Sequence, residues 1–305
     1  MSIIETSKQW VISERRIRVL CSEGRIIGAF KTGKTWNIHL ESTKPLDNRM
    51  RSKKIHFEGI DMIDFDEVNL LVDKYSKLKP LTQSQLKTIR DDLNLRWTFN
   101  SNAIEGNTLT LKETKVALEG ITIGGKSLVE HLEVVNHYSA LKYLEGIVIG
   151  PLCLSERIIK DIHRLILVNI DNKNARAYRN ENVLISGADH KPPKHYHVQQ
   201  LVKEFVDNVE SVFNKYHPII KAALVHGEFV KIHPFTDGNG RTSRIIMNFS
   251  LISSRLIPVV IKKEDRLAYY NALDKAHTTS NYKDFVELIK NSLIDEYNLR
   301  IDLLS

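Results

Sequence analysis

The chain has 305 residues and a formal net charge of +7, with 42% hydrophobic and 27% charged residues, a composition that excludes a disordered or fibrous protein. At about 150 residues per domain, this length predicts two domains. No apolar run approaches the roughly 18 residues of a membrane span, no apolar signal sequence follows Met1, and two cysteines cannot form a disulfide framework, so we expect a cytoplasmic protein without membrane contact.

The excess positive charge lies at the start of the chain. Residues 1–56 contain 12 Lys and Arg residues against 5 Asp and Glu residues, whereas the rest of the chain contains 32 of each kind. The segment also contains Trp10, Ile17, Phe30 and Trp36, so it is expected to fold and not to form a solvated tail. A folded basic module joined to a neutral body is typical of a protein that also contacts a polyanion.

Within this segment, Ser13 can cap a helix over residues 14–21, and residues 26–30 and 35–39 have the pattern of two short strands. Two helices and a basic hairpin are the parts of a winged helix-turn-helix, and the segment resembles the compact winged domains of the MerR and excisionase type. The resemblance implies that residues 1–52 bind DNA; the alternative is a protein-docking or purely structural module. The implied DNA contacts are Arg15, Arg16, Arg18, Lys31 and Lys34.

The remainder of the chain is expected to be helical. Residues 46–54 predict a polar linker, and the connector as a whole, residues 53–80, is expected to hold one short helix. Thr110 and Ser127 each precede a glutamate by three residues, which is the capping-box signature of a helix start. With these two helices included, helices are predicted over residues 110–120, 127–144, 155–170, 198–215, 219–232, 240–254, 264–277 and 281–302.

Residues 233–244 read His-Pro-Phe-Thr-Asp-Gly-Asn-Gly-Arg-Thr-Ser-Arg. Gly238 and Gly240 permit a tight turn whose backbone N–H groups point to one place, where the following helix also presents its positive end. Arg241 and Arg244 lie three residues apart in the first turn of that helix, so both guanidinium groups can grip phosphates. The segment is therefore expected to bind a phosphorylated ligand.

Two more residues of this stretch supply chemistry. Asp237 is a suitable oxygen ligand for a Mg²⁺ ion shared with phosphate oxygens, and His233 is a base that titrates near neutral pH. The stretch matches the Fic motif, H-x-F-x-[D/E]-G-N-G-R-x-x-R, at every fixed position, and residues 81–305 resemble the Fic family. Fic proteins are mostly helical enzymes that transfer AMP from ATP to hydroxyl side chains of target proteins.

The resemblance assigns a role to each matched residue. His233 would remove the proton from a target Ser, Thr or Tyr hydroxyl, and Asp237 would hold Mg²⁺ on the phosphates. Two tyrosines lie where family members place aromatic residues near the adenine, although packing in the core is an equal alternative for them. The nucleotide-binding residues implied are Gly238, Asn239, Gly240, Arg241, Arg244, Tyr269 and Tyr270.

A second motif lies upstream. Residues 101–106, Ser-Asn-Ala-Ile-Glu-Gly, match the Fic inhibitory pattern [S/T]-x-x-x-E-[G/N], which begins here with Ser101. In the family the glutamate pairs with the second arginine of the motif, which would be Glu105 with Arg244. The carboxylate would then occupy the place of the γ-phosphate, and the resemblance therefore implies self-inhibition.

Residues 178–190 resemble the Fic flap, a hairpin that docks the target by adding a backbone strand. Only residues 182–186 of the helical body have strand character, and the resemblance implies target contacts from Val183, Leu184 and Ile185. The nearby histidines 190, 195 and 197 lack partners at zinc-binding spacing and are expected to be loop residues.

Together these patterns predict a mainly α protein, with a winged helix-turn-helix over residues 1–52, a connector over 53–80 and an all-helical Fic domain with a small β-hairpin flap over 81–305. The expected function is self-inhibited adenylylation of a target protein or of the chain itself, with ATP and Mg²⁺. DNA is a second expected partner, and a homodimer is left open. Two alternatives also remain: a DNA-binding transcriptional regulator whose Fic body senses nucleotides or mediates interactions, and a Fic enzyme that removes AMP.

Overall fold

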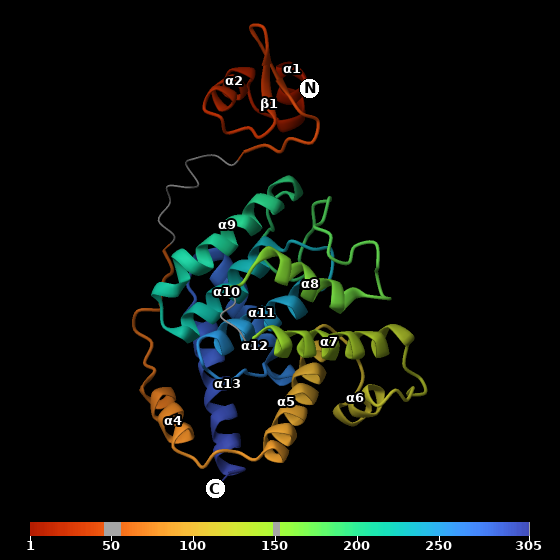
Figure 1. Ribbon diagram of the computed structural model, residues 1–305, viewed down its shortest axis with the longest axis vertical. Coiled ribbons are helices and arrows are strands. Elements are labelled where there is room, and N and C mark those ends of the chain that lie inside the picture. Colours follow the sequence, from red (N-terminus) through yellow and green to blue (C-terminus); the bar gives the residue numbers. More distant parts are fainter. Residues whose placement is uncertain (46–55, 149–152, 305) are drawn as a thin grey trace.

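The structure, a computed structural model, describes residues 1–45, 56–148 and 153–304, and the expected linker over residues 46–54 lies outside them (Figure 1). Helices dominate these ranges, which confirms the prediction of a mainly α protein. None of the helices in these ranges is both long enough and apolar enough to cross a membrane.

The first 45 residues form two helices and a two-stranded antiparallel hairpin. Ser13 accepts a hydrogen bond from the Arg16 backbone N–H, as expected for the cap of the second helix. Three residues separate the two helices, and Phe30 pairs with Asn37 across the hairpin. The elements are α1 (Ile3–Trp10), α2 (Glu14–Ser22), β1 (Ala29–Thr32) and β2 (Thr35–Ile38).

Strand β1 begins later than the sequence predicts, because Ile26 belongs to a small core and not to the hairpin. Ile26 is 3% exposed and packs with residues from both helices. The cluster gives this unit an apolar interior of its own, and among the described residues it shares no member with the main core. Its members are Ile3, Trp10, Ile17, Leu20, Cys21, Ile26 and Ile38.

The rest of the described chain forms helices around one continuous apolar core. The predicted capping boxes are present, since Thr110 and Ser127 accept the expected backbone hydrogen bonds from Glu113 and Glu130. The helix expected over 198–215 ends early and continues as a 3-10 turn. The α-helices are α4 (Asp66–Ser76), α5 (Gln83–Ile104), α6 (Leu111–Leu118), α7 (Leu128–Ile147), α8 (Glu156–Leu167), α9 (Val198–Ser211), α10 (Pro218–Ile232), α11 (Asn239–Ser253), α12 (Arg266–Thr279) and α13 (Lys283–Asp302).

Helices α10 and α11 form the centre of this body, with α7, α8, α9, α12 and α13 around them (Figure 1). Helix α10 is mostly apolar and mostly buried, which suits a central helix, and its charged residues Lys221, Glu228 and Lys231 keep partial exposure. Helix α11 is equally buried but carries polar residues, among them Arg241 and Arg244. Buried polar groups need partners. The two arginines at the start of α11 therefore mark this part of the core as a candidate binding site.

The strand expected over residues 182–186, and with it the β-hairpin of the flap, does not form. These residues follow an irregular path between α8 and α9, with a turn in which the Ala188 N–H donates to the Ile185 carbonyl. Alternating apolar residues alone do not make a strand, because a strand also needs a neighbouring backbone to pair with. Within the described ranges, the N–H groups of Val183, Leu184 and Ile185 have no hydrogen-bond acceptor.

Candidate active site

The loop between α10 and α11 is held in one shape by its own side chains. Gly238 has φ +75° and precedes the first turn of α11. The Asn239 amide accepts a hydrogen bond from the Phe235 N–H at 2.9 Å and donates to the Phe235 carbonyl at 2.8 Å. The resemblance implies that Asn239 helps to position the phosphate chain. Its side-chain amide, bonded to Phe235, fixes the shape of the loop.

His163 of α8 supports this loop, and no sequence pattern pointed to this residue. Its ring stacks on Phe235 with a centroid distance of 3.5 Å. Its Nε2 lies 3.0 Å from the Asp237 carbonyl, and its Nδ1 accepts the Arg176 N–H at 3.0 Å. Burial lowers the pKa of His163 to about 4, so the neutral ring donates from Nε2 and accepts at Nδ1. A Cβ on Gly238 would press against this ring at 3.3 Å.

The Arg244 guanidinium is almost fully enclosed, with 2% of its side chain exposed. Its Nη2 donates to Glu105 Oε1 at 2.7 Å and to the Ser101 carbonyl at 2.8 Å. Its Nε donates to Ser101 Oγ at 2.9 Å. The structure therefore brings together Ser101, Glu105 and Arg244, which are far apart in the sequence.

The Glu105 carboxylate lies at the first turn of α11. A Cβ built on Gly240 would collide with Glu105 Oε1. The carboxylate is thus placed against the positive end of a helix, where backbone N–H groups favour an anion. Because 30% of the Glu105 side chain is exposed, this place is open to exchange with another anion.

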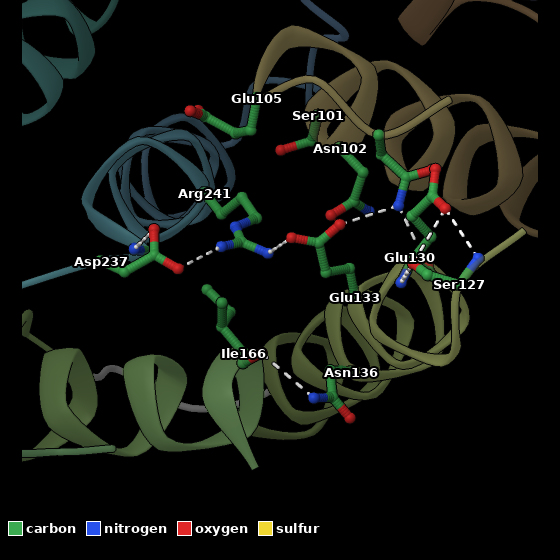
Figure 2. A network of polar contacts seen from close by, with 12 residues as sticks. Ser101, Asn102, Glu105, Ser127, Glu130, Glu133, Asn136, Ile166, Asp237 and Arg241 are labelled. Atoms are coloured by element: carbon green, nitrogen blue, oxygen red, sulfur yellow. Dashed lines mark hydrogen bonds and ion pairs between the residues drawn. The ribbon is translucent and has the colours of Figure 1, made fainter. Parts of the chain in front are cut away.

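Arg241 is held between two carboxylates (Figure 2). Its Nη2 donates to Asp237 Oδ2 at 3.1 Å, and its Nη1 donates to Glu133 Oε1 of α7 at 3.0 Å. Asp237 Oδ1 also accepts the Gly238 N–H at 2.6 Å. Glu133 is a second residue of the site that the sequence did not reveal.

The two tyrosines of α12 have different environments, and Tyr269 shows the core packing that was the alternative to an adenine contact. Tyr269 is 1% exposed, and its hydroxyl lies 3.2 Å from Arg244 Nη1 and 3.0 Å from His226 Nε2. A side chain enclosed in this way packs in the core and cannot stack on a base. Tyr270 is 40% exposed and donates to the Ile104 carbonyl at 3.2 Å, so only Tyr270 has a surface available to a ligand.

His233 ends α10 with φ 50° and ψ 62°. Burial and the neighbouring Arg179 guanidinium lower the pKa of His233 to about 4, so its imidazole is neutral at pH 7 and can accept a proton. The same Arg179, which the sequence did not single out, donates from Nε to the His233 carbonyl at 2.8 Å. Its other nitrogens donate to the carbonyls of Glu181 and Pro193, and Arg179 thereby joins the base of the flap to the histidine.

Of the residues expected to form the target-docking flap, Leu184 is 81% exposed, and Val183 and Ile185 are half-buried. The histidines beside the flap have structural contacts: His190 Nε2 lies 2.9 Å from the Lys231 carbonyl, and the His195 N–H donates to Asn182. Within the described ranges no group of three or more His, Cys, Asp or Glu side chains is placed to hold a metal.

A single exposed carboxylate nevertheless fits Mg²⁺, which commonly binds proteins through one or two carboxylates and takes its other ligands from water and phosphate. Asp237 has this character, because 62% of its side chain is exposed at the edge of the loop. The residues present are therefore compatible with Mg²⁺ that arrives with a nucleotide.

The basic residues of the N-terminal unit lie on its surface, in two groups. Arg15, Arg16 and Arg18 belong to α2, where Arg18 forms an exposed ion pair with Glu14. Lys31 lies over the Trp36 ring at 5.0 Å in the hairpin. Lys34, at the hairpin turn, is exposed.

Comparisons with known proteins agree with the geometry. The Fic/DOC family profile matches residues 153–251. Protein adenylyltransferase Fic of Drosophila mojavensis is 32% identical over 257 residues, which are 83% of this chain and 50% of that protein. The chain spans about half the length of the curated relatives it matches.

Solved structures are similar over most of the chain. Fic-1 (residues 134–508 of that protein) from C. elegans has a TM-score of 0.71 at 30% identity, over 78% of this chain and 71% of that one. A Fic domain containing signaling protein from Bacteroides thetaiotaomicron also has a TM-score of 0.71 at 30% identity, over 77% of this chain and 96% of that one.

Proposed function

The chain belongs to the Fic/DOC family, and from this premise we propose that it is a protein adenylyltransferase, which transfers AMP from ATP to a hydroxyl side chain of a protein. One observation carries the proposal: an anion-binding loop, two buried arginines and a neutral histidine meet at the start of α11. The loop and the arginines are suited to bind the phosphates of ATP, and the histidine is suited to accept the proton of the incoming hydroxyl.

The reaction needs little beyond positioning and charge neutralisation. The target hydroxyl oxygen attacks the α-phosphorus, the bond to the β-phosphate oxygen breaks, and pyrophosphate leaves. His233 accepts the hydroxyl proton, while the N–H groups of residues 238–240 and both arginines hold the phosphates. Asp237 would hold Mg²⁺, which would neutralise part of the phosphate charge. The flap around Leu184 would receive the target backbone as an added strand.

We further propose that the enzyme is self-inhibited. The support is the 2.7 Å ion pair between Glu105 and Arg244, together with the place of the Glu105 carboxylate against Gly240. In this state a carboxylate occupies the anion site and engages an arginine that the γ-phosphate requires. A target or a structural change that removes Glu105 would open the site.

Labelled ATP tests both proposals. The Glu105→Gly protein should label itself or added proteins more strongly than the unaltered chain, by roughly 10–150-fold if the pair is worth about 1.5–3 kcal/mol. His233→Ala in the Glu105→Gly background should reduce transfer by about 10²–10⁴-fold but still bind ATP. Equal labelling by the unaltered and Glu105→Gly proteins would contradict self-inhibition, and transfer by His233→Ala near its parent's rate would contradict the assignment of the base.

The same labelling experiment distinguishes AMP transfer from two other functions. Because Glu105 is partly exposed beside the phosphate site, it could orient a water molecule and let the enzyme remove AMP. In that case the unaltered chain would release label from previously modified protein, and Glu105→Gly would not. A regulator with a nucleotide-sensing body would bind ATP but transfer no label in either form.

For the N-terminal residues 1–52, we propose a winged helix-turn-helix that binds DNA, joined by a connector over residues 53–80 to a Fic domain over 81–305. The support is the separate small core, the two helices and hairpin, and the two exposed basic groups. Replacement of Arg15, Arg18 and Lys34 together by alanine should weaken binding of duplex DNA and reduce its salt dependence by about one unit of slope per lost phosphate contact.

A DNA mobility assay at several salt concentrations measures this effect. Full-length protein that does not bind duplex DNA even at low salt would contradict the proposal. Light scattering of the same samples gives the oligomeric state, and a homodimer would predict a palindromic binding site.

A further inference from the structure

Arg241 has two carboxylate partners that differ in their exposure to water. The Asp237 side chain is 62% exposed, whereas Glu133 is 19% exposed and Arg241 itself is 3% exposed. Ion pairs in water are weak and exchange readily, and charge-assisted hydrogen bonds in an enclosed place are stronger. The Glu133 contact is therefore the lasting one, while Asp237 is free to turn toward another ligand.

The shape of arginine makes a single fixed contact sufficient for orientation. A guanidinium group is planar and presents its donors in a rigid fork. With Nη1 fixed on Glu133, the direction of Nη2 and Nε is set as well. Nε of Arg241 is buried and has no partner among the described residues, so this arginine retains donor capacity that the protein does not use.

Glu133 is in turn held by Asn107. The Asn107 Nδ2 donates to Glu133 Oε2 at 2.9 Å and to the Glu130 carbonyl at 3.0 Å. Asn107 Oδ1 accepts the Leu109 N–H at 3.0 Å, which uses the other end of the amide. Figure 2 shows Glu133 reaching from α7 to Arg241 beside the end of α5.

Asn107 follows Glu105 by two residues. The intervening Gly106 has φ +104°, and the Asn107 N–H donates to the Asn102 carbonyl at 3.1 Å. One tight turn at the end of α5 therefore carries the partner of Arg244 and the residue that fixes the partner of Arg241. A displacement of this turn would affect both arginines.

We propose that Glu133 is a positioning residue that orients Arg241 for the phosphates of a nucleotide, and that Asn107 couples this orientation to the turn that carries Glu105. The inference rests on the proposed function, because it concerns nucleotide binding by the two arginines. It assigns opposite effects to two carboxylates of the same site: Glu105 opposes nucleotide binding and Glu133 promotes it.

ATP affinity measured by calorimetry in the Glu105→Gly background tests this inference. Simple charge repulsion predicts that loss of a carboxylate near a polyphosphate strengthens ATP binding. The positioning role predicts the reverse, so Glu133→Ala should weaken binding by roughly 5–20-fold, as expected when the phosphate contact of Arg241 is weakened but not lost. Glu133→Gln, which retains an oxygen at the same place, should recover part of the loss.

Glu145→Gln is the matched control. Glu145 lies on the same helix as Glu133 and accepts a hydrogen bond from Asn94 of α5 at 2.6 Å, but it has no contact with Arg241. This variant should keep the parental affinity, and thermal unfolding of all variants shows whether they remain folded. Unchanged or tighter ATP binding by folded Glu133→Ala would overturn the positioning role.

The Asn107→Ala variant tests whether Asn107 acts on Arg241 through Glu133. It should weaken ATP binding in the Glu105→Gly protein and have no further effect when Glu133→Ala is also present. Equal losses in both backgrounds would overturn the coupling. Failure of Glu105→Gly to bind ATP would overturn this inference and the proposed function together, whereas ATP binding without any AMP transfer would overturn only the proposed function.

Discussion

Burial sets the protonation state of the histidines around the loop between α10 and α11. Burial, reinforced by Arg179, lowers the pKa of His233 to about 4, and burial also lowers the pKa of His163 to about 4. Both rings are therefore neutral at pH 7. For His163 this preserves two backbone contacts, and for His233 it leaves a nitrogen able to accept a proton.

The pH dependence of transfer should reflect this neutral base. In the Glu105→Gly protein, kcat should be nearly constant between about pH 6 and 8 and fall only as the pH approaches the pKa of His233, because protonation removes the acceptor. Arg179→Met removes a positive charge and should move this acid limb to higher pH, whereas Arg179→Lys should move it less. A limb centred near the ordinary histidine pKa in the Glu105→Gly protein would contradict the assignment.

The two tyrosines of α12 should differ in nucleotide selectivity. Tyr270→Ala removes the exposed ring and should reduce the preference for ATP over GTP if that ring contacts the base. Tyr269→Phe removes only a buried hydroxyl that contacts Arg244 and His226. It should leave selectivity unchanged and lower the free energy of unfolding by about 1–3 kcal/mol, since buried partners lose a hydrogen bond. Competition binding and urea unfolding measure the two effects, and a selectivity change in Tyr269→Phe alone would reverse this view.

Site residues could be predicted only where they are neighbours in the sequence or form a familiar short pattern. Residues 233–244 carry a loop, an exposed aspartate and two arginines at fixed spacing, and the Ser101 to Glu105 spacing is equally local. Glu133, His163 and Arg179 come from separate elements and meet the loop only after folding. A buried histidine or a glutamate on a helix face has no spacing that distinguishes it from ordinary core or surface residues.

At the scale of elements, helices were predictable because their start signals are local. The boxes at Thr110 and Ser127 and the cap at Ser13 lie where the sequence indicates. Strands depend on distant partners, which explains both errors. Residue 26 packs into a core instead of joining β1, and residues 182–186 have no neighbouring strand within the described chain.

The unpaired flap leads to a prediction about target docking. Leu184→Pro removes one backbone N–H and fixes φ, so it should block strand addition. Transfer to a protein target should fall at least about tenfold, which corresponds to about 1.4 kcal/mol of lost docking energy, while ATP affinity stays unchanged. Leu184→Ala keeps the N–H and is the control. Equal losses in both variants would show that the side chain, and not the backbone, binds the target.

At the scale of the whole molecule, the helical body contains many histidines that its folding keeps neutral. Burial is the largest cause of a lowered pKa for each of them. Four of these histidines lie in α7, α8, α10 and α12, and the fifth, His233, ends α10. The pKa is lowered to about 4 for His163 and His233 and to about 3 for His277. For His137 and His226 it also lies well below the ordinary value.

The body should therefore lose stability in mild acid. An unfolded histidine has a pKa of about 6.5, so below that pH the unfolded chain binds protons that the folded chain excludes. Stability is fully present above the unfolded pKa and falls as the pH is lowered toward the folded pKa, by up to about 1.4 kcal/mol per pH unit for each such histidine. Urea unfolding between about pH 7.5 and 5.5 measures the slope. His226→Gln should reduce the slope of the free energy of unfolding against pH by the contribution of one histidine. This holds even if the substitution lowers stability overall, because the slope reports bound protons and not contacts. A free energy of unfolding that stays constant or rises over this range would show that the buried rings accept protons in the folded state.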